Sequence, residues 1–324
     1  VNMPEMDGFE VCQRLHQNPS TAGIPVIFLS AVDELDAKIH GLKLGAVDYI
    51  SKPFLLDEVI ARVNTHLTIN QLKIKVQNQR DEMERELQQV ADTQRSLLLE
   101  ELPRIAGLQL AVSYETSRYA GGDLFDIISL DNNRWGLLIA DAEGHSTPAA
   151  VLMAMCCALF RSCPCDPGDP AAVISYLNNG LCRVSDSQLL TALYAVYDAE
   201  SSRMTMARAG HMPPLLCRAA ADGVAEVSCE GVFPLGLKYF DDDIPVEELS
   251  LQPGDRLLFY TVGVVDRFNS RDEPYGIERL KGILGDSALD SPQELVDKMN
   301  EDTALFSDGR LADDDQTLLL VTVD

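Results

Sequence analysis

The chain has 324 residues and a formal net charge of -25, so it is long enough for about two domains and strongly acidic. Such a charge repels nucleic acid and anionic membrane surfaces, and we expect neither as a partner. Hydrophobic residues make up 46%, which allows real cores, but the best apolar run, residues 148–160, is too short to cross a bilayer. The eight cysteines include no CxxC pair, which favours a reducing cytoplasm with free thiols.

The first segment alternates helical and strand patterns. We predict helices over residues 8–17, 34–44 and 55–67, and strands over residues 24–31 and 47–50. The run IPVIFLSA is apolar throughout, as in a strand that is buried on both faces of a parallel sheet. This order favours an open α/β sheet, for which about sixty residues are few.

A polar segment without Gly or Pro follows over residues 67–99. Its apolar residues recur every seven positions: Ile69, Val76, Met83, Val90 and Leu97. That spacing is one seam of a heptad pattern, and it predicts a coiled coil that joins two copies of the chain in parallel. The second seam is weak, so a helix that lies against its own domains remains the alternative.

The third segment contains many short strand patterns and two longer helical patterns. Strands are predicted over residues 108–114, 135–140, 192–198, 203–209, 255–260 and 317–322, and helices over residues 148–161 and 170–184. Strands and helices set in blocks indicate an α+β domain, with sheets stacked as a sandwich and covered by helices. The predicted organisation is residues 1–66, a linker over 67–101, and a domain over 102–324.

Residues 1–66 resemble the receiver domain of two-component response regulators. The resemblance is carried by VNMPEMDGFE at the start, by Ser30 after an apolar strand, and by GAVDYISKPF. It implies an Asp that accepts a phosphoryl group from a histidine kinase or another phosphodonor. That Asp would lie two residues before Asn2, outside this chain. The resemblance also implies that Ser30 and Lys52 bind the phosphoryl group, that Tyr49 is the aromatic switch, and that the Asn2 carbonyl completes a Mg shell.

Four acidic motifs in the third segment stand at strand ends or beside glycines: AGGDLFD, IADAEGHSTPAA, YTVGVVD and ADDDQTLLLV. Carboxylates gathered in this way repel unless cations neutralise them, and two Mg or Mn ions would also activate a water for attack on a phosphate ester. The order of motifs over residues 91–324 resembles the PPM family of metal-dependent serine/threonine phosphatases, in its sporulation and stress-response branch. AGHMPPLL, FPLGL and QRSLLLEELP are further landmarks.

The PPM resemblance assigns roles to individual residues. It implies that Asp141 bridges two metal ions, that the Ala142 carbonyl is a further ligand, and that Asp123 serves the second ion. Asp314 matches the last carboxylate, and Asp126 is a weaker candidate in the same motif as Asp123. Solvated acids or bracing histidines are expected at the remaining polar positions: Asp313, residues 241–243, His145 and His211.

Val262 stands where the family has an Asp that binds the same ion as the positions of Asp141 and Asp314. Valine offers no oxygen, so this ion should bind weakly or not at all, while the fold survives. Glu143 replaces a small residue and is a candidate for a compensating carboxylate; Ser146 replaces a glycine.

Two functions therefore stay open for the chain. One is a response regulator whose phosphorylated receiver controls a phosphatase, with weak or lost activity, that acts on a phosphoserine protein. By resemblance, that protein would be an anti-sigma-factor antagonist. The other is a pseudo-phosphatase that serves as a phosphorylation-switched adaptor or sequesters its partner.

Overall fold

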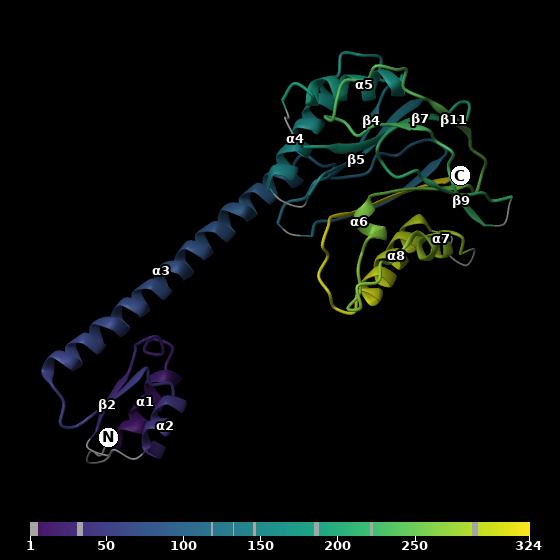
Figure 1. Cartoon of the computed structure of the whole chain (residues 1–324). Helices are drawn as coiled ribbons and strands as arrows, with labels where there is room; N and C mark the ends of the chain where they lie inside the picture. Colours follow the sequence, from purple (N-terminus) through teal and green to yellow (C-terminus); the bar gives the residue numbers. More distant parts are fainter. Residues whose placement is uncertain are drawn as a thin grey trace. The chain divides into compact units, whose positions relative to one another are not determined.

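The computed structural model describes residues 6–30, 35–117, 119–131, 133–144, 147–184, 188–220, 223–286 and 291–324 (Figure 1). The chain divides into two compact units, Val1–Glu86 and Leu87–Asp324. Among the helices of the described residues, none combines the length and the apolar character needed to cross a membrane.

The described residues of the first unit form two helices and two strands before the long helix begins. They are α1 (Gly8–Gln17), β1 (Ile27–Ser30), α2 (Leu35–Lys43) and β2 (Asp48–Ser51). β1 and β2 pair in parallel, so their carboxyl ends lie at one edge of the sheet. A small core gathers Cys12, Phe28 and Ala46, with Tyr49 packed against it. The α/β fold predicted for this segment is confirmed.

The helix α3 (Leu56–Arg95) is continuous across the boundary predicted near residue 67. No Gly or Pro interrupts its 40 residues, and Asp57 and Glu58 in its first turn favour the positive end of the helix dipole. The heptad positions within α3 are exposed, and Val76 is 63% exposed. The fifth heptad position, Leu97, lies after the end of α3 and packs against the core beneath α4. Burial returns only near the end of the helix, at Ala91 and Gln94.

The second unit contains two sheets. The first has the order β10-β7-β6-β5-β4, with β11 also paired to β7, and the second has the order β3-β13-β12-β8-β9. The strands of the first sheet are β4 (Asp123–Ser129), β5 (Arg134–Ala142), β6 (Leu190–Asp198), β7 (Arg203–Ala209), β10 (Gly231–Val232) and β11 (Glu247–Ser250). Those of the second are β3 (Leu108–Glu115), β8 (Leu215–Cys217), β9 (Val224–Glu226), β12 (Arg256–Tyr260) and β13 (Gln316–Val323).

Strand alternation produces four layers. On β5, Leu138 and Ala140 pack beneath the helices α4 (Thr147–Arg161) and α5 (Pro170–Leu181). Leu137 and Ile139 face the second sheet. The other face of the second sheet packs on α7 (Ile277–Leu284) and α8 (Pro292–Phe306), as Figure 1 shows. The predicted sheet sandwich covered by helices is confirmed, although α7 and α8 were not predicted.

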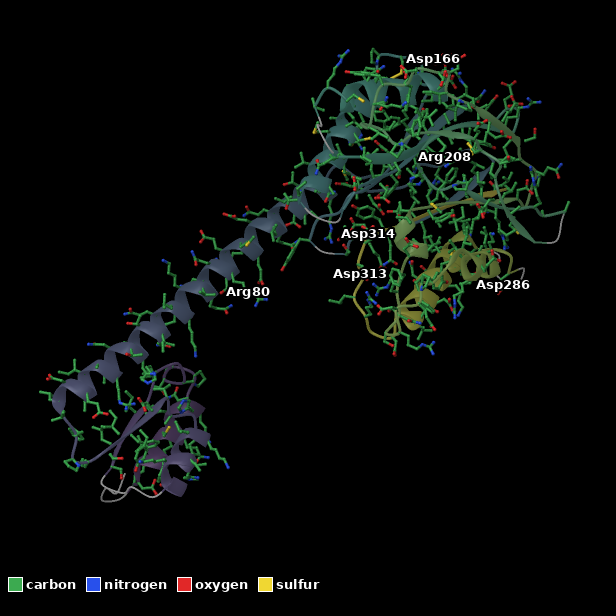
Figure 2. All side chains as sticks on the ribbon, viewed as in Figure 1. Arg80, Asp166, Arg208, Asp286, Asp313 and Asp314 are labelled. Atoms are coloured by element: carbon green, nitrogen blue, oxygen red, sulfur yellow. A yellow bond between two sulfur atoms is a disulfide. The ribbon has the colours of Figure 1, made fainter. Side chains whose placement is uncertain are left out.

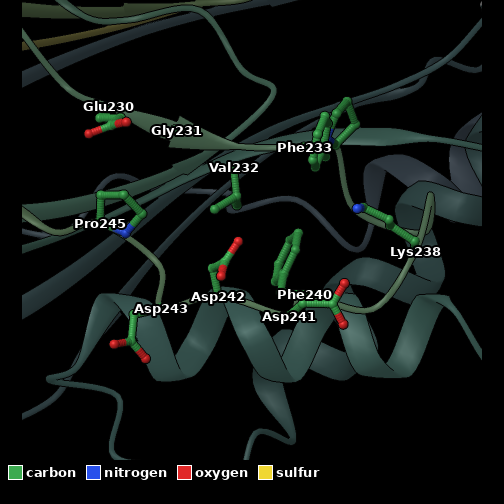
Figure 3. A pocket seen from close by; sticks show the side chains of 11 residues that line it. Glu230, Gly231, Val232, Phe233, Lys238, Phe240, Asp241, Asp242, Asp243 and Pro245 are labelled. Atoms are coloured by element: carbon green, nitrogen blue, oxygen red, sulfur yellow. The ribbon is translucent and has the colours of Figure 1, made fainter.

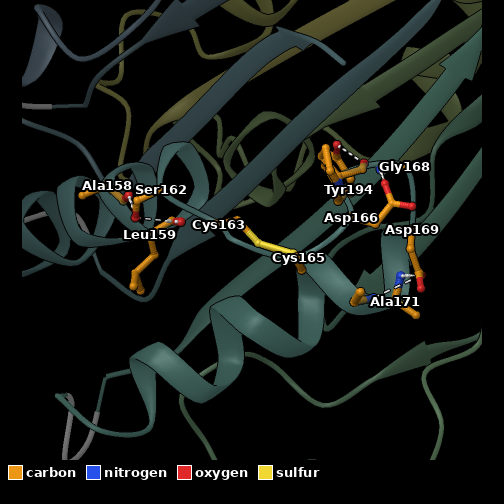
Figure 4. The surroundings of a disulfide bond; sticks show 12 residues. Ala158, Leu159, Ser162, Cys163, Cys165, Asp166, Gly168, Asp169, Ala171 and Tyr194 are labelled. Carbon is orange, nitrogen blue, oxygen red and sulfur yellow. Dashed lines mark hydrogen bonds between the residues drawn. A yellow bond between two sulfur atoms is a disulfide. The ribbon is translucent and has the colours of Figure 1, made fainter. Parts of the chain in front are cut away.

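The loop between α4 and α5 carries a disulfide between Cys163 and Cys165 (Figure 4). The sequence predicted free thiols throughout, and that prediction fails at these two positions. The Cys-Pro-Cys spacing brings the two Cα atoms to 5.5 Å, which is within the range of a disulfide. The other six cysteines are free, as predicted.

Candidate functional site

Strand geometry brings acidic side chains together at one end of the interface between the two sheets. Asp123 begins β4 and lies directly opposite Asp141, the penultimate residue of β5. Odd-numbered positions of β5 face the second sheet, so Asp141 has the same orientation as Leu137 and Ile139. Asp314 approaches from the loop before β13, where Figure 2 labels it beside Asp313.

Asp123 is held by the second sheet. It is 1% exposed, and its Oδ2 accepts hydrogen bonds from Thr261 Oγ1 at 2.8 Å and Thr317 Oγ1 at 2.6 Å. The Thr317 N–H donates in turn to Thr261 Oγ1 at 2.9 Å, which fixes both hydroxyls. Burial and the charge of Asp141 raise the pKa of Asp123 well above its usual range, although the two hydroxyls oppose this shift.

Asp141 and Asp314 are close enough to repel. Burial raises the pKa of Asp141 to about 7, and the carboxylates of Asp314 and Asp315 push it in the same direction. Carboxylates that raise one another's pKa are stabilised when a cation neutralises them. A divalent ion bound among these carboxylates would relieve their mutual repulsion.

Asp315 is a functional residue that the sequence did not single out. Its buried carboxylate accepts from the Ser117 N–H at 2.7 Å and the Gly122 N–H at 2.6 Å. Asp315 therefore fixes the glycine loop that precedes Asp123 instead of standing free as a ligand. Two features of the sequence could have indicated this role. The glycines of AGGD leave backbone N–H groups accessible, and the third acid of ADDDQ is a carboxylate that can accept from them.

Backbone oxygens converge beside Gly122. A Cβ atom at this glycine would lie 2.7 Å from the Ala142 carbonyl oxygen and 3.0 Å from that of Gly144. Only glycine leaves this space open, and carbonyl oxygens with carboxylates are the ligands that Mg prefers. These donors fit one divalent ion next to Asp141.

Val262 begins the short helix α6 (Val262–Val265) directly after Thr261, the residue that bonds Asp123. A Cβ atom at its other neighbour, Gly263, would collide with the Asp315 carbonyl and crowd the Asp314 Cβ, so the chain here passes close to the acid cluster. The Val262 side chain packs against the apolar cluster beneath α7 and α8. It therefore adds packing and no oxygen at the edge of the acid cluster.

The donor set as a whole fits two ions poorly. In the part of the chain that the structure describes, no group of three or more His, Cys, Asp or Glu side chains is arranged to hold a metal. Asp123 Oδ2 is bonded to two hydroxyls, the Asp315 carboxylate is bonded to two N–H groups, and Val262 offers no oxygen, so few carboxylate oxygens are left for a second ion.

Asp126, the weaker candidate for a metal ligand, lies outside the acid cluster, so the structure does not support that role. It is three residues after Asp123 on the same strand, so it faces the opposite side, towards α4. There its Oδ2 accepts from Arg161 Nε at 2.8 Å. Arg161 Nη2 also donates to the Leu97 carbonyl at 2.8 Å, which ties this strand to the residues after α3.

A more direct contact joins α3 to the glycine loop. Gln94, 5% exposed, accepts from the Gly121 N–H through its Oε1 at 3.0 Å and donates through its Nε2 to the Gly121 carbonyl. Ala91, one turn earlier, packs with Ala120 and Ala150. The end of the linker helix is thus bonded to the loop that presents Asp123.

The remaining candidates in this unit have the following positions. Glu143 is exposed, and Asp313 pairs with Arg310 at 2.8 Å. His211 is buried and its Nδ1 shares a hydrogen bond with Thr191 Oγ1 at 2.8 Å, which suits a bracing role. Burial, and next the charge of Arg208, lower its pKa to about 3. His145 and Ser146 lie outside the described residues.

In the first unit, Ser30 and Lys52 meet at one edge. Ser30 ends β1 and is buried, and the Lys52 N–H donates to its carbonyl at 2.7 Å. Tyr49 lies on β2 with Lys38 Nζ 5.8 Å from its ring centre. Asn2 lies outside the described residues.

Relatives of each unit are recognisable. Residues 1–64 match the response regulator receiver domain. The DNA-binding regulator RpaA of Synechocystis sp. is 48% identical over 65 residues, which are 20% of this chain and 27% of that protein. A probable cyclic di-GMP phosphodiesterase of Vibrio cholerae is 42% identical over 87 residues, 27% of this chain and 20% of the other. The chain thus spans about a quarter of the length of these curated relatives.

Solved structures share the fold of the second unit. The SiaA-PP2C domain of Pseudomonas aeruginosa has a TM-score of 0.66 at 18% identity, covering 76% of this chain and 98% of that one. The RsbU and RsbW domains of Rv1364c from Mycobacterium tuberculosis have a TM-score of 0.58 at 27% identity, covering 70% and 63%. Residues 131–324 match the family described as Stage II sporulation protein E. The chain therefore belongs to the Stage II sporulation protein E family, with a receiver domain joined to a PP2C-type phosphatase domain.

Proposed function

We propose that the chain is a response regulator whose receiver controls a metal-dependent output domain that acts on a phosphoserine of a partner protein. We further propose that its turnover is low because Val262 removes one of the carboxylates that would hold one of the two ions. The observation that carries this proposal is the acid cluster of Asp123, Asp141 and Asp314 at the sheet interface, with an apolar residue at its edge.

The proposed roles in the output domain follow from the contacts. Mg or Mn bound at the cluster would supply a water activated for attack on the phosphate ester. Asp141 and the Ala142 carbonyl would hold the better bound ion, and Asp314 would share in the weaker one. Thr261 and Thr317 keep one oxygen of Asp123 occupied and so orient the other. RsbX, a protein that shares the fold of this unit, has been solved in complex with magnesium.

The proposed control starts in the receiver. A phosphodonor such as a histidine kinase would phosphorylate it, with Ser30 and Lys52 binding the phosphoryl group, Mg held in part by the Asn2 carbonyl, and Tyr49 as the switch. The change would reach the output domain through α3, since Gln94 bonds the glycine loop before Asp123 and the Leu97 carbonyl accepts from Arg161, which bonds Asp126 on β4. A two-state shift of the helix would then bias the acid cluster.

The proposed assembly is a parallel dimer through the coiled coil, because the heptad positions of α3 are exposed in the single chain. The proposed boundaries are residues 1–66, 67–101 and 102–324. An anti-sigma-factor antagonist is the proposed class of partner, supported by the RsbU-type relative, and the receiver supports a cytoplasmic location.

A phosphatase assay with Mn and p-nitrophenyl phosphate tests the chemistry. We expect low turnover for this chain, a large gain for Val262→Asp, and loss of the gain when Asp141→Asn is added, because Asp141 is proposed to bridge both ions. Equal activity of the chain and Val262→Asp would contradict the assigned role of position 262 and would direct attention to Glu143.

The second candidate is a pseudo-phosphatase that binds its partner without turning it over, as an adaptor or by sequestering it. Val262 is the observation that favours it, because a side chain packed into an apolar cluster provides no ligand. This reading gains support if the chain is inactive and a phosphoserine partner protein binds it regardless of Val262→Asp.

A further inference from the structure

A cavity of about 420 Å³ lies beside the FPLGL turn, away from the carboxylates of the acid cluster (Figure 3). Its walls come from β10, from the turn that follows it, and from the acidic loop that returns towards β11. No role for these segments follows from the proposed chemistry.

The cavity lies at the same end of the first sheet as the acid cluster. Val232 on β10 pairs with Ala209 at the end of β7. The chain then turns back, so that Leu235 exchanges hydrogen bonds of 2.8 and 3.1 Å with Leu190. Leu190 in turn lies opposite Ala142, the neighbour of Asp141. Val232, which lines the cavity, is three strand spacings from β5, across β7 and β6, so roughly 14 Å separate the cavity from the strand that carries Asp141.

The walls are apolar and held in place. Phe233 and Phe240 line the cavity with Pro234 and Pro245, and Figure 3 shows Phe240 and Val232 on facing sides. The buried amide of Asn178 fixes the turn by donating to the Lys238 carbonyl at 2.9 Å and accepting from the Gly236 N–H at 2.9 Å.

The charges around these walls are unbalanced. Four carboxylates line the cavity against a single ammonium group: Glu230, Asp241, Asp242 and Asp243 against Lys238. None of the four side chains makes a hydrogen bond or ion pair with another described residue. Lys238 Nζ lies 4.8 Å from the centre of the Phe233 ring, so one wall already accepts a cation.

We propose that this cavity binds a Lys or Arg side chain of the phosphoprotein on which the output domain acts, four or five residues from the phosphoserine. The aromatic and proline walls suit the aliphatic stem of such a side chain, and the carboxylates suit its head. An extended chain advances about 3.3 Å per residue, so about four or five residues span the distance to the acid cluster. The placement of the phosphoserine rests on the proposed function; the choice of a basic side chain rests on the cavity itself.

Fluorescence anisotropy with labelled phosphoserine peptides of about twelve residues, in the presence of Mn, tests this inference. One peptide carries Arg four and five positions from the phosphoserine on both sides, and its partner carries Ala there. We expect the Arg peptide to bind about fivefold more tightly, and the double variant Asp241→Asn/Asp242→Asn to abolish the difference. Lys238→Gln should tighten the Arg peptide about twofold, because it removes a competing cation.

The control variant Glu294→Gln/Asp297→Asn removes the same charge from the exposed face of α8 and should leave the preference for Arg unchanged. Equal binding of the Arg and Ala peptides, a preference that survives Asp241→Asn/Asp242→Asn, or no binding up to about millimolar peptide would each overturn the inference. Removing the phosphate from both peptides tests the proposed function separately. If the preference for Arg remains and the phosphate has no effect on affinity, only the proposed function is contradicted, and the cavity inference stands.

Discussion

Gln94 offers a direct test of the connection between the linker helix and the acid cluster. Its buried side chain makes two hydrogen bonds to the backbone of Gly121, two residues before Asp123. Gln94→Leu keeps most of the side-chain volume and the helix propensity but removes both bonds. Gln94→Glu keeps the acceptor for the Gly121 N–H and loses the donor to its carbonyl.

The size of the effect follows from the two groups that lose their partners. A buried backbone N–H or carbonyl left unpaired costs about 1–3 kcal/mol. Gln94→Leu affects two such groups, so the free energy of unfolding should fall by about 3 kcal/mol, allowing for partial rearrangement. In a unit of this size that change lowers the unfolding midpoint by about 9 °C. Gln94→Glu should lie between Gln94→Leu and the unchanged chain.

The single tryptophan, Trp135 on β5, makes the measurement specific. Its fluorescence reports the unfolding of the unit that contains the acid cluster and does not depend on the receiver. Gln89→Leu, on an exposed position of the same helix, is the matched control and should leave the midpoint unchanged. An unchanged midpoint and an unchanged Mn affinity in Gln94→Leu would refute the coupling of α3 to the glycine loop.

Three further predictions concern assembly, pH and the strand that carries Asp123. Replacing Val76, Met83 and Val90 by Lys should give monomers in light scattering. A monomeric unchanged chain at about tens of micromolar would refute the coiled coil. The folded pKa of His211, about 3, lies below its unfolded value of 6.5, so the unfolded state binds more protons between these values. The contribution of His211 is complete above pH 6.5 and should fall by about 2 kcal/mol by pH 5, and His211→Asn should remove this dependence in Trp135 melts. Arg161→Met should destabilise the unit by about 2 kcal/mol, because the 1% exposed Asp126 loses its cation. Arg161→Lys should restore part of this stability. An unchanged unfolding midpoint in Arg161→Met would show that the ion pair contributes nothing to stability.

Sequence patterns predicted the elements that have a clear period. The apolar run that contains β1, the strand predicted over residues 135–140 of β5 and the helical patterns of α4 and α5 all appear where they were expected. The strands β8, β9, β10 and β11 have four residues or fewer, too few for a period to be recognised. The helix α8 had a usable signal, since Ser291 and Pro292 start it and Leu295, Val296 and Met299 share one face.

The site was predicted less completely, because its contacts cross long distances along the chain. Asp123 and Asp126 stand in one motif, and only the strand assignment of β4 reveals that they face opposite layers. Gln94 and Gly121 are 27 residues apart, and no local pattern in an otherwise polar helix distinguishes this glutamine from its neighbours.

The packing of Val262 has a consequence for how this protein depends on metal. An Asp at this position would add a further negative charge beside Asp141, Asp314 and Asp315, and it would leave the apolar cluster less well filled. Folding of such a variant would draw strength from bound Mg or Mn, because a ligand that binds only the native state stabilises it. With valine, the unit needs less of that help, because one carboxylate fewer repels its neighbours and the apolar cluster is filled. The stability of the unit should therefore depend less on the supply of divalent ions, and its binding surfaces should stay folded when those ions are scarce.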